Sequence, residues 1–148
     1  MDVPMSSLSR PRFVNWAMII ALGVTVIGAV NLSLFVPQMK AYLGAQGIPV
    51  EEIGNGMLYG SAMGSMVLVA IFCFFIARGS NVARWIWTVF AAYGAVSAVG
   101  NLGMIFQISL VYAIVAIALQ LMFIAATVLL FMPESGAWFK ATKLARKT

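Results

Sequence analysis

Three long stretches of the chain contain no charged residue, and they indicate the environment in which it folds. Residues 13–39, 53–77 and 85–133 lack Asp, Glu, Lys and Arg altogether. A helix of about 20 apolar residues crosses the hydrocarbon core of a bilayer, which is about 30 Å thick. The first two stretches therefore each predict one membrane-spanning helix. The third is long enough for two, so we expect it to double back.

The residues between the apolar stretches set the limits of the predicted helices. Pro37 is expected to end the first, since proline lacks an amide hydrogen and clashes with the preceding turn. Pro49 is expected to begin the second, where an amide hydrogen would have no partner. Glu51 and Glu52 then lie at the positive end of the helix dipole. We expect a tight reversal within 103–108. The predicted spans are 13–36, 49–77, 82–102 and 109–132.

The segment between the first two spans has a weaker pattern. Met39, Tyr42 and Leu43, within 38–48, have approximately helical spacing. A short helix on the membrane surface and a plain loop both fit this segment.

The composition agrees with a protein that lies almost entirely in the membrane. Of the 148 residues, 63% are hydrophobic and 9% are charged, and the mean hydropathy is +1.01. A water-soluble domain needs far more charge to cover its surface. We therefore expect an all-α protein, an antiparallel bundle of four membrane-spanning helices. It forms a single domain over 13–132, with short tails at 1–12 and 133–148.

The basic residues predict the orientation of the bundle. Lys40 is the only basic residue on one predicted side of the membrane, and the other eight share the opposite side: Arg10, Arg12, Arg78, Arg84, Lys140, Lys143, Arg146 and Lys147. Lys and Arg accumulate in the cytoplasmic segments of membrane proteins. We expect a cell (inner) membrane protein with both termini in the cytoplasm, and the net charge of +5 then gives no reason to expect nucleic-acid binding.

A row of glycines is the sharpest motif in the chain. Gly56, Gly60 and Gly64 follow one another at four-residue spacing, so they share one face of the second span. Small residues let helix backbones approach closely, which is a main source of helix association in lipid. The favoured interpretation is packing within the chain, against the small residues of the first span. A homodimer interface and a glycine-lined pore are the alternatives.

Two asparagines are the strongest polar candidates within the spans. Asn31 and Asn101 each lie toward the end of a span that is far from the basic residues, in the similar contexts GAVNL and AVGNL. Interhelical hydrogen bonding is the default role of such amides. A polar ligand site is the alternative, and a weak internal duplication of two helical hairpins is a further interpretation.

The residues that are missing argue against chemistry. The chain has no His, its one cysteine is Cys73, and the predicted span cores contain no ionisable acid or base. General acid–base catalysis and proton-coupled transport rest on such groups, and a Cys/His metal site cannot be assembled. We expect no enzyme, no cofactor and no metal.

The last residues read as a basic amphipathic segment. Lys140, Lys143, Arg146 and Lys147 supply the charge, while Trp138, Ala141, Leu144 and Ala145 line another side, and Ser135 is expected to cap the helix. Such a segment suits the anionic inner leaflet, and docking of a cytosolic partner is the alternative.

Two short segments resemble a known group of proteins. Gly79–Trp85, GSNVARW, and Leu130–Phe139, LFMPESGAWF, are similar to the edges of small four-span proteins of bacterial inner membranes. The resemblance implies the general layout and assigns no functional residue. The sequence as a whole predicts a non-enzymatic accessory subunit, assembly factor or regulator whose partners are the lipid bilayer and a membrane protein or a second copy. The alternative is an oligomeric pore or facilitator for a small solute or ion.

Overall fold

The computed structural model describes residues 9–49 and 54–145, and nearly all of them are helical. The helices in the described residues are α1 Arg12–Ala45, α2 Asn55–Ala77, α3 Asn81–Gly100, α4 Leu102–Ile108, α5 Leu110–Leu130 and α6 Pro133–Ala145. Four of these, α1, α2 from Gly56 onward, α3 and α5, are long and apolar enough to cross a membrane. The expectation of an all-helical chain with four candidate spans is confirmed.

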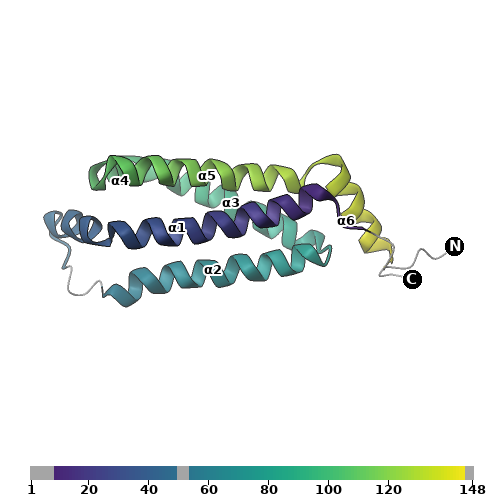
Figure 1. The fold of residues 1–148 in the computed structure, drawn as a ribbon, viewed down its shortest axis with the longest axis horizontal. Helices are drawn as coiled ribbons and strands as arrows, with labels where there is room; N and C mark the ends of the chain where they lie inside the picture. The colour runs from purple at the N-terminus through teal and green to yellow at the C-terminus, as the bar shows by residue number, and fades with distance from the viewer. Residues whose placement is uncertain (1–8, 50–53, 146–148) are drawn as a thin grey trace.

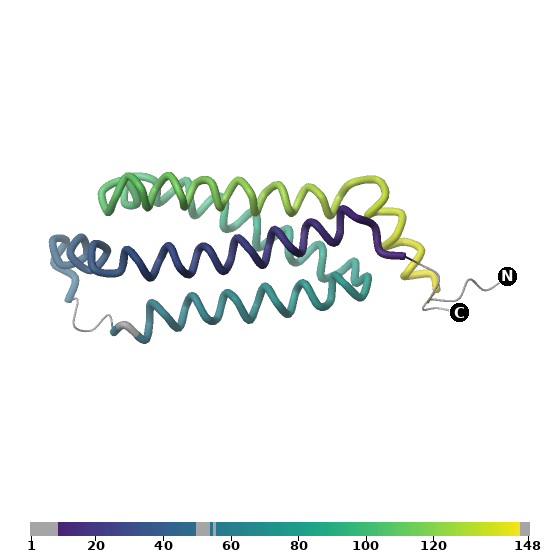
Figure 2. Tube along the Cα trace, in the orientation of Figure 1, coloured from purple at the N-terminus to yellow at the C-terminus, as the bar shows by residue number. Residues whose placement is uncertain are grey.

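The long helices lie lengthwise in one body. α1 lies between α2 and α5, and α3 crosses behind them, from the end of α2 toward α4 (Figure 1). The beginning of α1 and the whole of α6 lie at one end of the molecule, here called the α6 end, while α4 lies at the other, the α4 end (Figure 2).

Helix α1 is longer than expected because it continues through Pro37. It ends at Ala45 rather than Val36, so most of the 38–48 segment is helical. Its 34 residues measure about 51 Å at about 1.5 Å per residue. The missing amide of Pro37 leaves the carbonyl of Ser33 without its helical partner, a defect that transmembrane helices tolerate. The helix axis changes direction in its last part (Figure 2), as a proline inside a helix predicts.

Helix α2 begins later than predicted. Pro49 is not helical, and α2 starts at Asn55 after Gly54. Glu51 and Glu52, expected in its first turn, lie outside the described residues. At its other end the chain turns into α3. Gly79 has φ +76°, and Ser80 caps α3 by accepting a hydrogen bond from the amide of Ala83 at 3.2 Å.

The reversal between the third and fourth spans is a short helix rather than a tight turn. α3 ends at Gly100, α4 occupies Leu102–Ile108, and an extended Ser109 (ψ 138°) separates α4 from α5. Gly103 and Gln107, which lie in the segment expected to form a tight reversal, are part of helix α4.

Helix α6 packs on the long helices by a different side than the sequence indicated. Pro133 begins it directly, so Ser135 lies inside the helix, and its hydroxyl donates to the carbonyl of Leu129 at 2.9 Å instead of capping. The buried side is Ser135, Trp138, Phe139 and Thr142, whereas Leu144 is 68% exposed. The apolar side expected to face lipid headgroups is therefore partly an internal contact.

The hydrophobic core is concentrated near the α6 end. Its buried members are Val14, Ala17, Ala21, Val69, Cys73, Ile76, Ala83, Trp87, Leu130, Trp138 and Phe139. They come from the first third of α1, the end of α2, the start of α3, the end of α5, and α6. The small residues of α1 thus pack against Val69, Cys73 and Ile76, and the other half of the molecule holds the groove described next.

Candidate functional site: a groove between four helices

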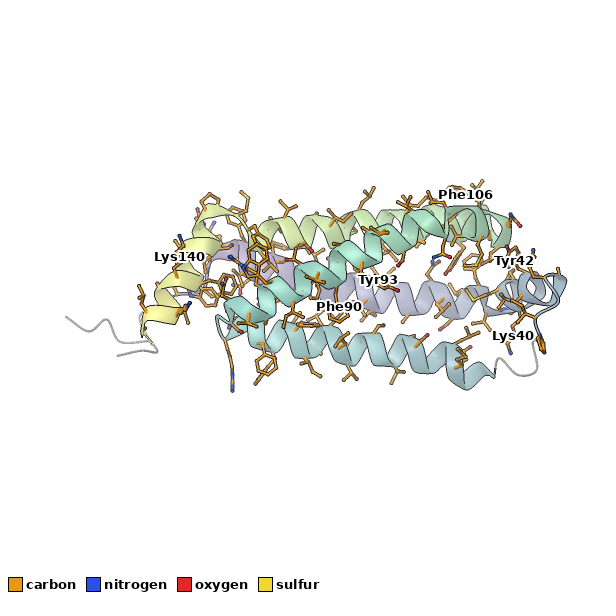
Figure 3. All side chains as sticks on the ribbon, turned by 180° about the vertical axis from the view of Figure 1, so that it is seen from behind. Lys40, Tyr42, Phe90, Tyr93, Phe106 and Lys140 are labelled. Atoms are coloured by element: carbon orange, nitrogen blue, oxygen red, sulfur yellow. The ribbon has the colours of Figure 1, made fainter. Side chains whose placement is uncertain are left out.

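A groove of about 480 Å³ lies between α1, α2, α3 and α5, beside the core. Its walls are mainly apolar, and its aromatic side chains are Phe90, Tyr112 and Phe123. Phe90 belongs to the middle part of α3 (Figure 3), the helix that crosses the others. Among the described residues, none of the side chains that line the groove is charged. The groove can therefore receive a neutral molecule or an apolar segment.

Two carboxamides line this groove without a hydrogen-bond partner. Asn31 on α1 is 7% exposed, and no described residue forms a hydrogen bond with its side chain. The Nε2 of Gln120 on α5 is buried, and it too lacks a partner within the described part of the chain. A buried polar group left unpaired costs about 1–3 kcal/mol. Gln120 Nε2 is one such group, and together with Asn31, which lines the same groove, it sets the groove apart from ordinary packing.

Three hydroxyl groups around the groove already have partners. Thr25 donates to the carbonyl of Ala21 at 2.8 Å. Ser61 and Ser65 on α2 each donate at 2.7 Å to the carbonyl three residues earlier. These bonds stay within their own helices. The hydroxyl of Tyr112 has no hydrogen-bond partner among the described residues, so the unmet hydrogen-bonding capacity of the groove belongs to the two amides and to this phenol.

An aromatic cluster closes the groove toward the core. Phe123 stacks on Trp87, with ring centroids 4.6 Å apart, and Phe72 contacts Phe90 at 5.7 Å. The indole nitrogen of Trp87 donates to the hydroxyl of Thr127 at 3.0 Å, which fixes its ring. These contacts hold the aromatic side chains in place between the groove and the core.

The glycine row of α2 faces away from the groove and from the core. Gly60 and Gly64 precede the buried Val69 and Cys73 by nine residues each, which is two and a half turns of about 3.6 residues. Gly56, Gly60 and Gly64 are exposed, and a Cβ built at any of them meets no described atom within 4 Å beyond its own helix. The packing against α1 that the sequence favours is not observed at these glycines.

The other predicted residues lie apart from the groove. Asn101 is exposed at the end of α3, where its side-chain nitrogen donates to the carbonyl of Ser97 at 2.7 Å. The two asparagines are thus not structurally equivalent. Lys140 and Lys143 are exposed on α6, and Arg146 and Lys147 lie outside the described residues. The structure does not gather these candidates into one site.

Sequence reasoning missed Gln120, the most informative residue of the groove. The signal was present, because Gln120 is a lone amide at the centre of a charge-free span. Tyr112, which packs on Phe35 with ring centroids 5.5 Å apart, was missed as well. A tyrosine near a span end is ordinarily an interfacial anchor, so nothing in its position singled it out.

Comparison with known protein families, curated proteins and solved structures finds no match to this chain.

Proposed function

We propose that this chain is a non-enzymatic multi-pass membrane protein that binds another membrane-spanning helix through the glycine face of α2, defined as Gly56, Gly60 and Gly64. The observation that carries the proposal is the direction of this face, which points away from Val69 and Cys73 and has no neighbour among the described residues. An accessory subunit, an assembly factor or a regulator would act through such a contact.

Membrane physics supports helix docking at this face. Lipid tails are as apolar as leucine, so apolar burial does not drive helices together, and close backbone packing does. The glycine face offers that close approach over two helical turns. The neighbouring Met57 and Met63 are 73% and 63% exposed, and methionine side chains adapt to irregular partners.

The proposal includes an orientation, with four spans forming an antiparallel bundle in a cell membrane and both termini in the cytoplasm. Lys140 and Lys40 lie at opposite ends of the molecule (Figure 3). Arg10 reaches the carbonyl of Ala77 at 3.1 Å, and the guanidinium of Arg84 lies over the ring of Phe139 on α6. These arginines share the α6 end with Lys140, and positive charge favours the cytoplasmic side.

Gly60→Leu should weaken association of the protein with its helix partner about tenfold or more, because a side chain at this position holds the backbones apart. A loss of about 1.4 kcal/mol suffices for that factor. Association is measured by co-purification from membranes, and by Förster transfer between labelled copies in bilayers for self-association. Gly23→Leu is the matched control: Gly23 has no neighbour within 4 Å, but Ile19 and Ile27 flank it at four-residue spacing.

Equal effects of Gly60→Leu and Gly23→Leu would contradict the proposed interface. Loss of transfer between labelled copies would identify the partner as a second copy, and loss of a co-purified membrane protein would identify an accessory role. Solute flux through liposomes that Gly60→Leu abolishes would instead establish the oligomeric pore and refute the accessory role.

The proposed orientation is tested with reporters joined after Thr148. A fluorescent protein that matures only in the cytoplasm should be bright in a bacterial host, and a periplasmic phosphatase at the same position should be inactive. The same pair placed after Gly47, which lies beyond α1, should give the reverse result. An active phosphatase after Thr148 would refute the orientation.

A further inference from the structure

The unpartnered amides of the groove point to a ligand that can form hydrogen bonds without carrying charge. Asn31 is more than nine-tenths buried, and Gln120 places its Nε2 beyond the reach of any described hydrogen-bond acceptor. Within the part of the chain that the structure describes, no charged side chain lines the groove to hold an ionic group. A carboxamide can donate to a carbonyl or accept from a hydroxyl, so either group on a neutral ligand would satisfy it.

The depth of Gln120 restricts which molecules can reach it. It is the central residue of α5, ten residues from Leu110 and ten from Leu130, or about 15 Å from each end at about 1.5 Å per residue. The headgroup and ester carbonyls of a phospholipid stay near the membrane surface. A carbonyl reaches the middle of the bilayer only on a molecule that has no charged headgroup.

The two amides reach the groove from facing helices. A Cβ built at Gly28 lies 3.9 Å from the side chain of Leu119, and Phe35 contacts Tyr112, so α1 and α5 run in opposite directions here. In this register Asn31 lies about one helical turn, about 5.4 Å along the axis, from Gln120. A ring that lies between α1 and α5 can therefore meet one amide on each side.

The walls of the groove favour a flat ring. Phe90, Tyr112 and Phe123 all line it, and aromatic faces pack well on planar rings. The volume of about 480 Å³ lies within the range of small-molecule sites, about 300–1,000 Å³. The ring and the first isoprenoid unit of a lipid-soluble quinone would occupy such a space.

We propose that the groove binds a membrane quinone, with Asn31 and Gln120 hydrogen-bonded to the oxygens of its ring. The oxidised ring accepts hydrogen bonds from the amide nitrogens, and the reduced ring donates to the amide oxygens. The inference concerns binding alone, and it does not depend on the glycine face of α2, which lies on the opposite side of that helix.

The test measures binding of a short-tail ubiquinone analogue to the full-length protein in phosphatidylcholine nanodiscs that contain no quinone. The signal is quenching of tryptophan fluorescence, to which Trp87 contributes beside the groove. We expect saturable quenching, above that caused by the analogue dissolved in the lipid. Gln120→Leu and Asn31→Leu should each weaken binding about five- to tenfold, the effect of about one neutral hydrogen bond.

Two matched controls distinguish loss of quinone binding at the groove from a general effect of the substitution on the protein. Gln107→Leu makes the same substitution at an exposed position of α4 and should leave binding unchanged. Gly94 faces the amide, since a Cβ built there lies 4.0 Å from Nε2 of Gln120. Gly94→Ala should therefore be tolerated, whereas Gly94→Leu should fill the groove and abolish binding. The Gly94 pair keeps the test decisive if Gln120→Leu does not fold.

Three results would overturn the proposal. The first is the absence of saturable quenching. The second is equal competition by diacylglycerol, a neutral lipid with ester carbonyls and no ring. The third is a lower thermal stability of the ligand-free Gln120→Leu protein together with unchanged quinone affinity, because a purely structural amide would behave in that way. An unpartnered amide predicts unchanged or raised stability and weaker binding.

Discussion

Gly79→Ala should destabilise the protein by about 2–5 kcal/mol, because two unfavourable terms act together at this turn. Gly79 has φ +76°, a conformation that costs an L-residue about 1–2 kcal/mol. A Cβ at this position would lie 2.5 Å from Cγ2 and 3.0 Å from Cβ of Thr142 on α6. Forcing a methyl group into a packed contact costs about 1–3 kcal/mol more. The measurement is SDS-induced unfolding in mixed micelles, followed by circular dichroism.

Gly47→Ala separates the two penalties of the Gly79 variant. Gly47 has the same φ of +76°, but a Cβ there meets no described atom within 4 Å. It should lose only the conformational part, about 1–2 kcal/mol. Thr142→Ala should recover part of the loss in the Gly79→Ala background, since it removes the nearest atoms. Equal losses for the two glycine variants would show that the contact with α6 contributes nothing.

Phe139→Ala should cost about 3–5 kcal/mol and loosen α6 from the rest of the protein. Phe139 is 1% exposed. Its ring lies edge-on to Trp138 with centroids 4.9 Å apart, and the guanidinium of Arg84 lies 4.9 Å from its centre. α6 lies outside the four candidate spans, and Phe139 belongs to the core cluster that joins α6 to the long helices.

The effect on α6 is read by SDS-induced unfolding and by hydrogen exchange of its amides. In Phe139→Ala, exchange should accelerate over Pro133–Ala145 before the long helices lose protection. Leu144→Ala on the same helix is the control, because Leu144 is 68% exposed, and it should change stability by less than about 0.5 kcal/mol. Unaltered protection of α6 in Phe139→Ala would refute the role assigned to this ring.

The number of spans could be predicted from the sequence, whereas several helix ends could not. Charge-free stretches identify spans because lipid excludes charge over a fixed thickness. Pro37 was expected to end α1, but the helix continues through it. A transmembrane helix tolerates the carbonyl that loses its hydrogen bond to the proline nitrogen, here that of Ser33. Pro133 was read correctly as a boundary, yet α6 begins at that residue, so Ser135 cannot cap it.

The faces of the helices were harder to predict than their existence. A four-residue glycine row has the same pattern whether it contacts a helix of its own chain or faces lipid. The direction of the glycine row is opposite to the side of α2 that carries the buried Val69 and Cys73. Because α2 is apolar on all sides, the periodicity of its sequence does not show which side is buried. The groove forms where α3 crosses its neighbours and is lined by four helices. The position of Gln120 in a groove could therefore not be predicted from the sequence of α5 alone.

The concentration of the core at the α6 end implies an uneven distribution of rigidity along the molecule. Interlocked side chains hold the helices where α1 begins and α2 ends, while the groove-bearing half contains few fully enclosed residues. Local opening requires little free energy where few buried contacts must be broken. We therefore expect the far ends of α2 and α3 to separate more readily than the ends that the aromatic core holds together.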